Sequence, residues 1–271
     1  MSQNLTAPFR GATVWCMPHP RRAARIGHWA PVVLSGLALA ALPLIASCTV
    51  NQTLEVSRDG SGILSTHAEV SPLLRDYLSS LAEVSGGAVP LKDGRVFDAP
   101  SIRKDFQARP GVEVLKAETP TASSLDLDLA FDSLQDALQG QGALQAAGAI
   151  TVAEEDGSTT LRLRLDRSTW SQLVALFPPL RDPFVQQLGP QGTGKVTESD
   201  YLEMIRFSMG EAAPGLLRKS FFTLTVRPEG QIVSQAGGTM GDGAVVFRIP
   251  VLRVLVLDRP LEYSVTYRTG G

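Results

Sequence analysis

The chain has few of the residues that build metal and disulfide sites. It holds two cysteines and three histidines in 271 residues. Two cysteines exclude a disulfide scaffold and a zinc site with several cysteine ligands, and a single histidine after residue 47 excludes a metal site with several histidines there. Charged residues make up only 19% of the chain, with a formal net charge of −2. This balance argues against nucleic-acid binding, which calls for a basic surface. Hydrophobic residues make up 44%, enough for a core, so full disorder is excluded.

Acidic residues are missing from the first 47 positions. Residues 1–47 hold four of the 25 basic residues and none of the 27 acidic ones, so residues 48–271 carry a net charge of −6. The basic residues precede residues 30–47, an uncharged apolar run that ends in small side chains. A basic segment, an apolar run and small residues in this order are typical of a secretory signal peptide. Met17 lies just before the basic cluster, so translation starts at either Met1 or Met17.

The end of the apolar run resembles the lipobox of bacterial lipoproteins. The residues that carry the resemblance are Leu44, Ile45, Ala46 and Ser47, followed by Cys48. By this resemblance, a signal peptidase recognises the four residues and cuts before Cys48, whose thiol carries the lipid that anchors the protein to a membrane. An uncleaved transmembrane helix and ordinary secretion are the alternatives. Pro31 and Pro43 disfavour the helix because proline interrupts helical hydrogen bonding.

These features predict two parts in the chain. Residues 1–47 form the signal peptide, and residues 48–271 form a single exported domain with mobile loops near 140–148 and 189–195. The predicted location is the cell envelope, with the lipid holding the domain to a membrane. Thr49 is not the aspartate that retains lipoproteins at the inner membrane of well-known Gram-negative bacteria, so the outer membrane is favoured over the inner one.

Three turns separate runs of alternating polar and apolar residues. Asp59-Gly60 and Asp156-Gly157 are strong hairpin signals and predict hairpins over residues 53–70 and 150–166. Pro228-Glu229-Gly230 predicts a third, with strands on both sides. The strand-rich tail includes Val254–Leu257, which we interpret as a strand.

Helix signals follow the first two hairpins. Ser71-Pro72 predicts the start of a helix after the first, Ser168 or Thr169 caps one after the second, and Thr197 caps a third. Because strands and helices do not alternate strictly, a doubly wound parallel sheet is disfavoured. We therefore predict an α+β fold: an antiparallel sheet built from hairpins, with helices packed on one face.

Enzyme motifs in the chain fail on context. Gly189–Lys195 matches the glycine and lysine spacing of a P-loop, but Val196 replaces the hydroxyl residue that would bind Mg²⁺. Ser101 and Lys104 have the spacing of the nucleophile and base in penicillin-interacting enzymes, but lie in a short, highly charged segment. His67, the one histidine after residue 47, would have to serve any Ser-His-Asp triad. We therefore expect no enzyme activity, no cofactor and no bound nucleotide.

Binding or assembly remains as the predicted function. A non-catalytic binding module for lipid or another apolar envelope ligand is the first hypothesis. Its candidate lining residues are Phe177, Phe184, Tyr201, Phe207, Phe221 and Phe222. The alternative is an assembly factor that pairs with a protein partner through an exposed edge strand at Val254–Leu257. A penicillin-interacting serine enzyme is a remote alternative.

Short motifs also resemble the LppM-type lipoproteins of mycobacteria. They are the lipobox, the early Asp59-Gly60 hairpin, the segment Phe131-Asp132-Ser133-Leu134 and the strand-rich tail. The resemblance implies an envelope domain that binds lipid.

Overall fold

The computed structural model describes residues 48–84, 91, 93–139, 148–170, 189–190 and 196–268. All of them belong to one compact unit, Val33–Gly271. The strands are β1 (Cys48–Val56), β2 (Gly62–Val70), β3 (Val112–Glu118), β4 (Ser124–Phe131), β5 (Ile150–Glu155), β6 (Ser158–Leu165), β7 (Phe221–Pro228), β8 (Gln231–Ala236), β9 (Thr239–Gly241), β10 (Ala244–Pro250) and β11 (Leu261–Arg268). The helices are α1 (Pro72–Val84), α2 (Ala99–Gln107), α3 (Leu134–Gln139), α7 (Glu198–Met209), α8 (Ala213–Arg218) and α9 (Val251–Val256).

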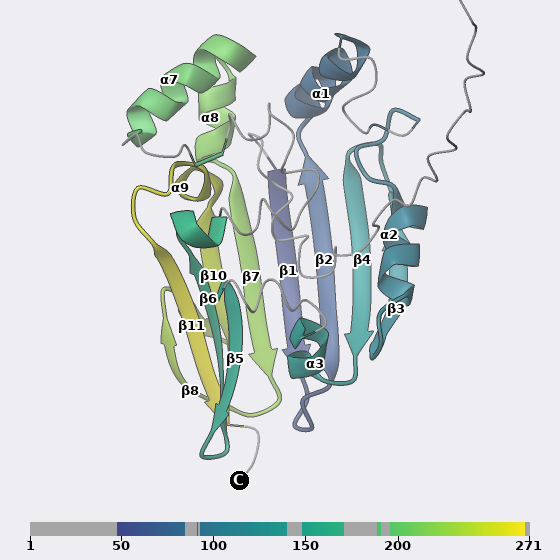
Figure 1. The fold of residues 1–271 in the computed structure, drawn as a ribbon, viewed down its shortest axis with the longest axis vertical. Coiled ribbons are helices and arrows are strands. Elements are labelled where there is room, and N and C mark those ends of the chain that lie inside the picture. Colours follow the sequence, from purple (N-terminus) through teal and green to yellow (C-terminus); the bar gives the residue numbers. More distant parts are fainter. Residues whose placement is uncertain are drawn as a thin grey trace, which may run out of the picture. The chain divides into compact units, whose positions relative to one another are not determined.

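The larger sheet has the strand order β3-β4-β2-β1-β7-β10-β9, seen face-on in Figure 1. β1 and β2 form the first predicted hairpin, with Leu54 opposite Leu64. β1 also pairs with β7, in parallel, so that Val50 lies opposite Phe222. Two strands that are far apart in the sequence therefore lie side by side in one sheet. The chain between them, from β2 to α8, forms the connection that two parallel strands require.

The second sheet has the order β5-β6-β11-β8 and is antiparallel throughout. β5 and β6 form the second predicted hairpin, joined by Asp156 and Gly157 with φ angles of 50° and 72°. Two successive positive φ angles are typical of the two-residue type I′ turn that Asp-Gly favours. The α+β prediction is confirmed, with two sheets instead of the single sheet expected from the sequence.

The third predicted hairpin is wrong. β7 and β8 are consecutive but do not pair with each other. β7 lies between β1 and β10, whereas β8 pairs with β11 in the second sheet. The turn Pro228-Glu229-Gly230 is not one of the tight hairpin turns that Asp-Gly forms. The chain therefore passes from one sheet to the other here.

The predicted strand at Val254–Leu257 is also wrong. The segment belongs to α9 and its C-cap, where Leu257 adopts a left-handed conformation with φ of 42°. All four residues are at most 7% exposed. A short apolar run buried on every side carries no periodicity that separates strand from helix. Because the segment is buried and helical, it offers no edge for a protein partner.

Both sheets contribute to one hydrophobic core. In β4, Leu125, Leu127 and Leu129 alternate inward and are at most 4% exposed. Phe106 of α2 and Val265 of β11 belong to the same buried cluster. Among the helices in the described part of the chain, none is long and apolar enough to cross a bilayer.

The helix starts follow the local sequence. The Ser71 hydroxyl accepts from the Leu74 amide at 3.3 Å at the start of α1. Thr197 and Asp200 form a reciprocal capping box at the start of α7, as the sequence predicts. After β6, however, residues 167–170 are helical and their cap is Asp166 instead of the predicted Ser168 or Thr169.

Candidate functional site

A pocket of about 370 Å³ lies where turns from the two sheets meet the start of α3. Its lining residues are Val56, Ser57, Arg58, Asp59, Gly60, Ser133, Leu134, Gln135, Val152, Glu154, Glu155, Asp156, Gly157, Ser158, Thr159 and Tyr267. They come from the β1–β2 turn, the β5–β6 hairpin, α3 and the end of β11. Both turns lie at the lower end of the view in Figure 1. Small-molecule sites are commonly concave and of this size.

Hydrogen bonds within the turns fix the pocket wall. Asp59 Oδ1 accepts from the Ser61 amide at 3.0 Å and from the Ser61 hydroxyl at 2.6 Å, and these bonds lower the pKa of Asp59. The Leu134 amide donates to the Gly60 carbonyl at 2.9 Å, which ties α3 to this turn. The Ser133 hydroxyl accepts from the Asp136 amide at 3.2 Å and caps α3. The first turn is therefore hydrogen-bonded directly to the start of α3.

Carboxylates dominate the charge of the lining. Four are present, from Asp59, Glu154, Glu155 and Asp156, against one guanidinium, from Arg58. Arg58 also lies 3.7 Å from Glu229, outside the lining. Like charges gathered around a concavity raise the local concentration of opposite charges. The pocket therefore favours a cationic, hydrogen-bonding ligand.

The buried residues of the pocket lining are largely apolar. Val56, Leu134 and Tyr267 are at most 5% exposed. Burial is the main cause that raises the pKa of Tyr267 to about 12. The described residues contain no group of three or more His, Cys, Asp or Glu side chains placed to hold a metal ion.

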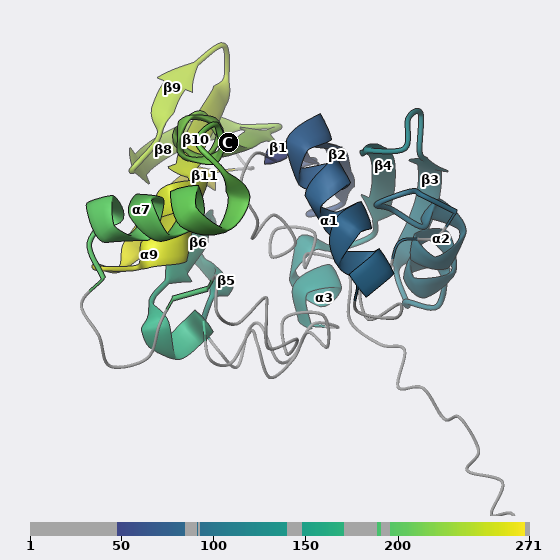
Figure 2. The same ribbon diagram turned by 90° about the horizontal axis from the view of Figure 1, so that it is seen from above.

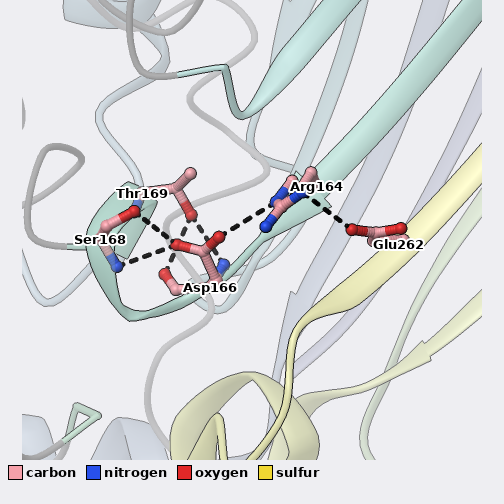
Figure 3. Close-up of polar contacts among 5 residues, drawn as sticks. All are labelled: Arg164, Asp166, Ser168, Thr169 and Glu262. Atoms are coloured by element: carbon pink, nitrogen blue, oxygen red, sulfur yellow. Dashed lines mark hydrogen bonds and ion pairs between the residues drawn. The ribbon is translucent and has the colours of Figure 1, made fainter.

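A second polar cluster follows β6 and is shown in Figure 3. Asp166 Oδ1 accepts from the Ser168 and Thr169 amides at 2.9 and 3.0 Å, while Oδ2 accepts from Arg164 Nε at 3.0 Å. These bonds, led by the one from the Thr169 backbone, lower the pKa of Asp166 to about 2. Arg164 also reaches Glu262 of β11 at 3.1 Å. The cluster is accounted for by helix capping and by cross-strand pairing of the second sheet.

His67 belongs to a third cluster, which spans three neighbouring strands. Its Nδ1 lies 2.7 Å from Asp126 Oδ1, and Lys116 Nζ donates to Asp126 Oδ2 at 2.9 Å. The hydrogen bond from His67 is the main cause that lowers the pKa of Asp126. The His67 side chain is 50% exposed. This is the polar outer face of the first hairpin that the sequence predicts.

The predicted binding residues are scattered. Tyr201 and Phe222 are buried in the core, whereas Phe207 is 95% exposed on α7. Phe221 is half-buried and lies under the guanidinium of Arg248, 3.8 Å from the ring centroid. These four residues do not line the pocket described above. Phe177 and Phe184 lie outside the described residues, so a shared apolar cavity stays a prediction.

Cys48 is the first residue of β1, and Leu44–Ser47 lie outside the described residues. Of the predicted loops at 140–148 and 189–195, the structure describes only Gly148, Gly189 and Pro190. The remaining enzyme-like motifs lie on the surface or outside the described residues. Ser101 and Lys104 are exposed on α2, and Ser101 contributes its amide to the Asp98 cap at 3.3 Å.

Sequence reasoning missed the pocket. Its two Asp-Gly turns are hairpin signals in the sequence, and both turns line the pocket. What the sequence lacks is any signal that the two hairpins, about 100 residues apart and in different sheets, meet at one end of α3.

No family model matches the chain, and no curated protein matches it. Among solved structures, the chain is similar to the NMR structure of the folded domain of LppM from Mycobacterium tuberculosis, at 12% sequence identity and a TM-score of 0.40, over 82% of this chain and 90% of that one. The sequence motifs resemble the same family, but a likeness this distant carries no argument for function. The function is therefore inferred from the residues of this chain.

Proposed function

We propose that this chain is a lipoprotein of the bacterial cell envelope, anchored through a lipid on Cys48, whose exported domain is a non-catalytic binding module. The lipobox sequence supports the anchor. The pocket supports binding, and the chemistry of its lining favours a polar, cationic ligand over the apolar one expected from the sequence.

One observation carries the proposal: the predicted anchor and the pocket lie at opposite ends of β1. Cys48 begins the strand and Val56, its last residue, lines the pocket. At about 3.3 Å per residue, the eight steps between them span about 26 Å. A lipid on Cys48 therefore leaves the pocket open to solutes on the side away from the membrane.

The anchor is tested with Cys48→Ser in the full chain. We expect the variant to keep its signal peptide, to take up no labelled fatty acid and to leave the membrane fraction upon mild extraction. Unchanged processing and unchanged fatty-acid labelling would overturn the anchor.

The pocket is tested with a bulky side chain on α3. Gln135 lines the pocket, whereas Asp136 is the next residue on the same helix, is exposed and does not line it. Native mass spectrometry of the purified full chain should find a polar, cationic compound bound to wild type and to Asp136→Trp, but not to Gln135→Trp.

The outcomes separate the ligand classes. A co-purifying lipid that Gln135→Trp retains would refute the polar pocket as the binding site and support the apolar ligand predicted from the sequence. If no compound binds, the melting temperature is measured with spermidine as a cationic probe. The absence of a Gln135-dependent shift would then refute the pocket.

A further inference from the structure

α7 and α8 lie at the end of the domain that bears Cys48, and they carry an exposed aromatic ring and, where α8 ends, a pair of basic residues. Phe207 is 95% exposed and Met204, one helical turn earlier, is 38% exposed. Residues three apart on a helix lie on the same side. The Phe207 ring is thus almost fully exposed to solvent. Tyr201 and Ile205, on the buried side of the same helix, are at most 1% exposed.

The strand register places the end of α8 at the level of Cys48. Val50 lies opposite Phe222 in the parallel pair β1–β7, so Cys48 lies at the level of Ser220, the residue between Lys219 and β7. α8 ends at Arg218, and α7 packs against α8. Figures 1 and 2 show α7 and α8 at the end of the larger sheet where β1 starts.

No linker separates the predicted lipid from the fold. β1 begins at Cys48 itself and pairs there with Val70 of β2. Flexible residues between a lipid and a domain would let the domain stand away from the bilayer. Without them, the elements that meet the start of β1 are held next to the lipid headgroups.

The charges along α7 and α8 are ordered. The acidic residues of α7, Glu198, Asp200 and Glu203, lie in its first two turns. The part closer to Cys48 carries exposed Arg218 and Lys219. Arg206, beside Phe207, lies 3.5 Å from Glu211. Aromatic side chains together with lysine and arginine are the combination that binds the interface of a membrane containing anionic lipids.

We propose that α7 and α8 form a membrane-contacting surface, with Phe207 inserted among the headgroups of an anionic bilayer and Arg218 and Lys219 on their phosphates. This inference rests on the proposed anchor at Cys48. The contact would fix the orientation of the domain on the bilayer and keep the pocket toward the solvent.

The experiment uses tryptophan substitutions in the full protein, purified from membranes and reconstituted in phosphatidylglycerol–phosphatidylcholine vesicles that contain brominated lipid. Phe207→Trp places the reporter on the proposed surface. Val233→Trp is the control, because Val233 is also exposed, at 52%, but lies on β8 near the pocket end of the second sheet. Trp170 is common to both variants, and its emission is subtracted with the parent protein.

We expect the brominated lipid to quench the reporter in Phe207→Trp and the vesicles to shift its emission to shorter wavelength, with no change in Val233→Trp. Equal quenching in both variants, or none in Phe207→Trp, would overturn the membrane surface. A shift in Phe207→Trp that depends on protein concentration without lipid would also overturn it, in favour of a second copy of the chain as the partner.

Failure of this inference is distinguishable from failure of the anchor. Fatty-acid labelling that requires Cys48, together with an unquenched reporter in Phe207→Trp, would leave the proposed function standing and refute the contact alone. Arg218→Glu with Lys219→Glu should weaken quenching at position 207 without changing fatty-acid labelling. If quenching at position 207 is unchanged in this double variant, Arg218 and Lys219 do not bind the lipid phosphates and that part of the proposal is wrong.

Discussion

The two ends of β1 are built from different kinds of structure. At the Cys48 end, β2 and β7 connect to helices, and the exposed residues include Phe207 and Lys219. At the Val56 end, the β1–β2 and β5–β6 turns carry mostly polar and acidic side chains, and the short helix α3 follows β4. One sheet thus separates exposed Phe207, Arg218 and Lys219 at one end from an acidic pocket at the other. The length of β1, fixed by its backbone, sets the distance between them.

The largest expected effect comes from a cavity in the helical end. Leu217 of α8 is fully buried, and Leu217→Ala should lower the free energy of unfolding by about 2–5 kcal/mol. Chemical denaturation followed by circular dichroism measures the change. Leu115→Ala on β3, where the side chain is 49% exposed, is the control and should cost about 0.5 kcal/mol. Because one core joins both sheets, a single transition is expected. Two separate transitions would show that the two ends fold independently.

A smaller effect is expected at the cap after β6. Asp166→Ala removes the acceptor of the Ser168 and Thr169 amides and should cost about 1–2 kcal/mol. Asp166→Asn retains the cap and should cost less. The pKa of Asp166 is about 2, against an ordinary value of 3.8. Its ionised form is therefore favoured by folding, and the stabilisation is complete above pH 3.8 and lost as the pH falls toward 2. The difference between wild type and Asp166→Ala should shrink over this interval, and a constant difference would contradict the assignment.

The smallest effect contrasts one glycine from each end. Gly157 in the pocket turn has φ of 72° and open space around the position of a Cβ atom, so Gly157→Ala should cost about 1 kcal/mol through backbone strain alone. Gly215 lies in α8, also with open space. Gly215→Ala should instead stabilise the protein, by up to about 1 kcal/mol. Thermal unfolding measures both, and changes of the same sign would contradict the two backbone conformations.

The local sequence predicted much of the fold. Asp59-Gly60 and Asp156-Gly157 gave two correct hairpins, because their backbone preferences act within the turn itself. Thr197 and Ser71 marked helix starts through bonds to residues three positions on. The errors came where the local signal was weak. Val254–Leu257 is apolar throughout and lacks periodicity. After β6, Asp166 and not the expected Ser168 or Thr169 accepts the hydrogen bonds from the first amides of the helix.

The sequence by itself determined the lack of acidic residues before position 48, the resemblance of Leu44–Cys48 to a lipobox, the α+β class and the polar turns. Each depends on residues close together in the chain. Only the tertiary structure decided that β7 pairs with β1 and not with β8, that the two Asp-Gly turns line one pocket, and that α7, with its exposed Phe207, lies at the end of the sheet where β1 starts. These features depend on contacts between residues about 100 or more positions apart, which the packing of a shared core selects and no local pattern encodes.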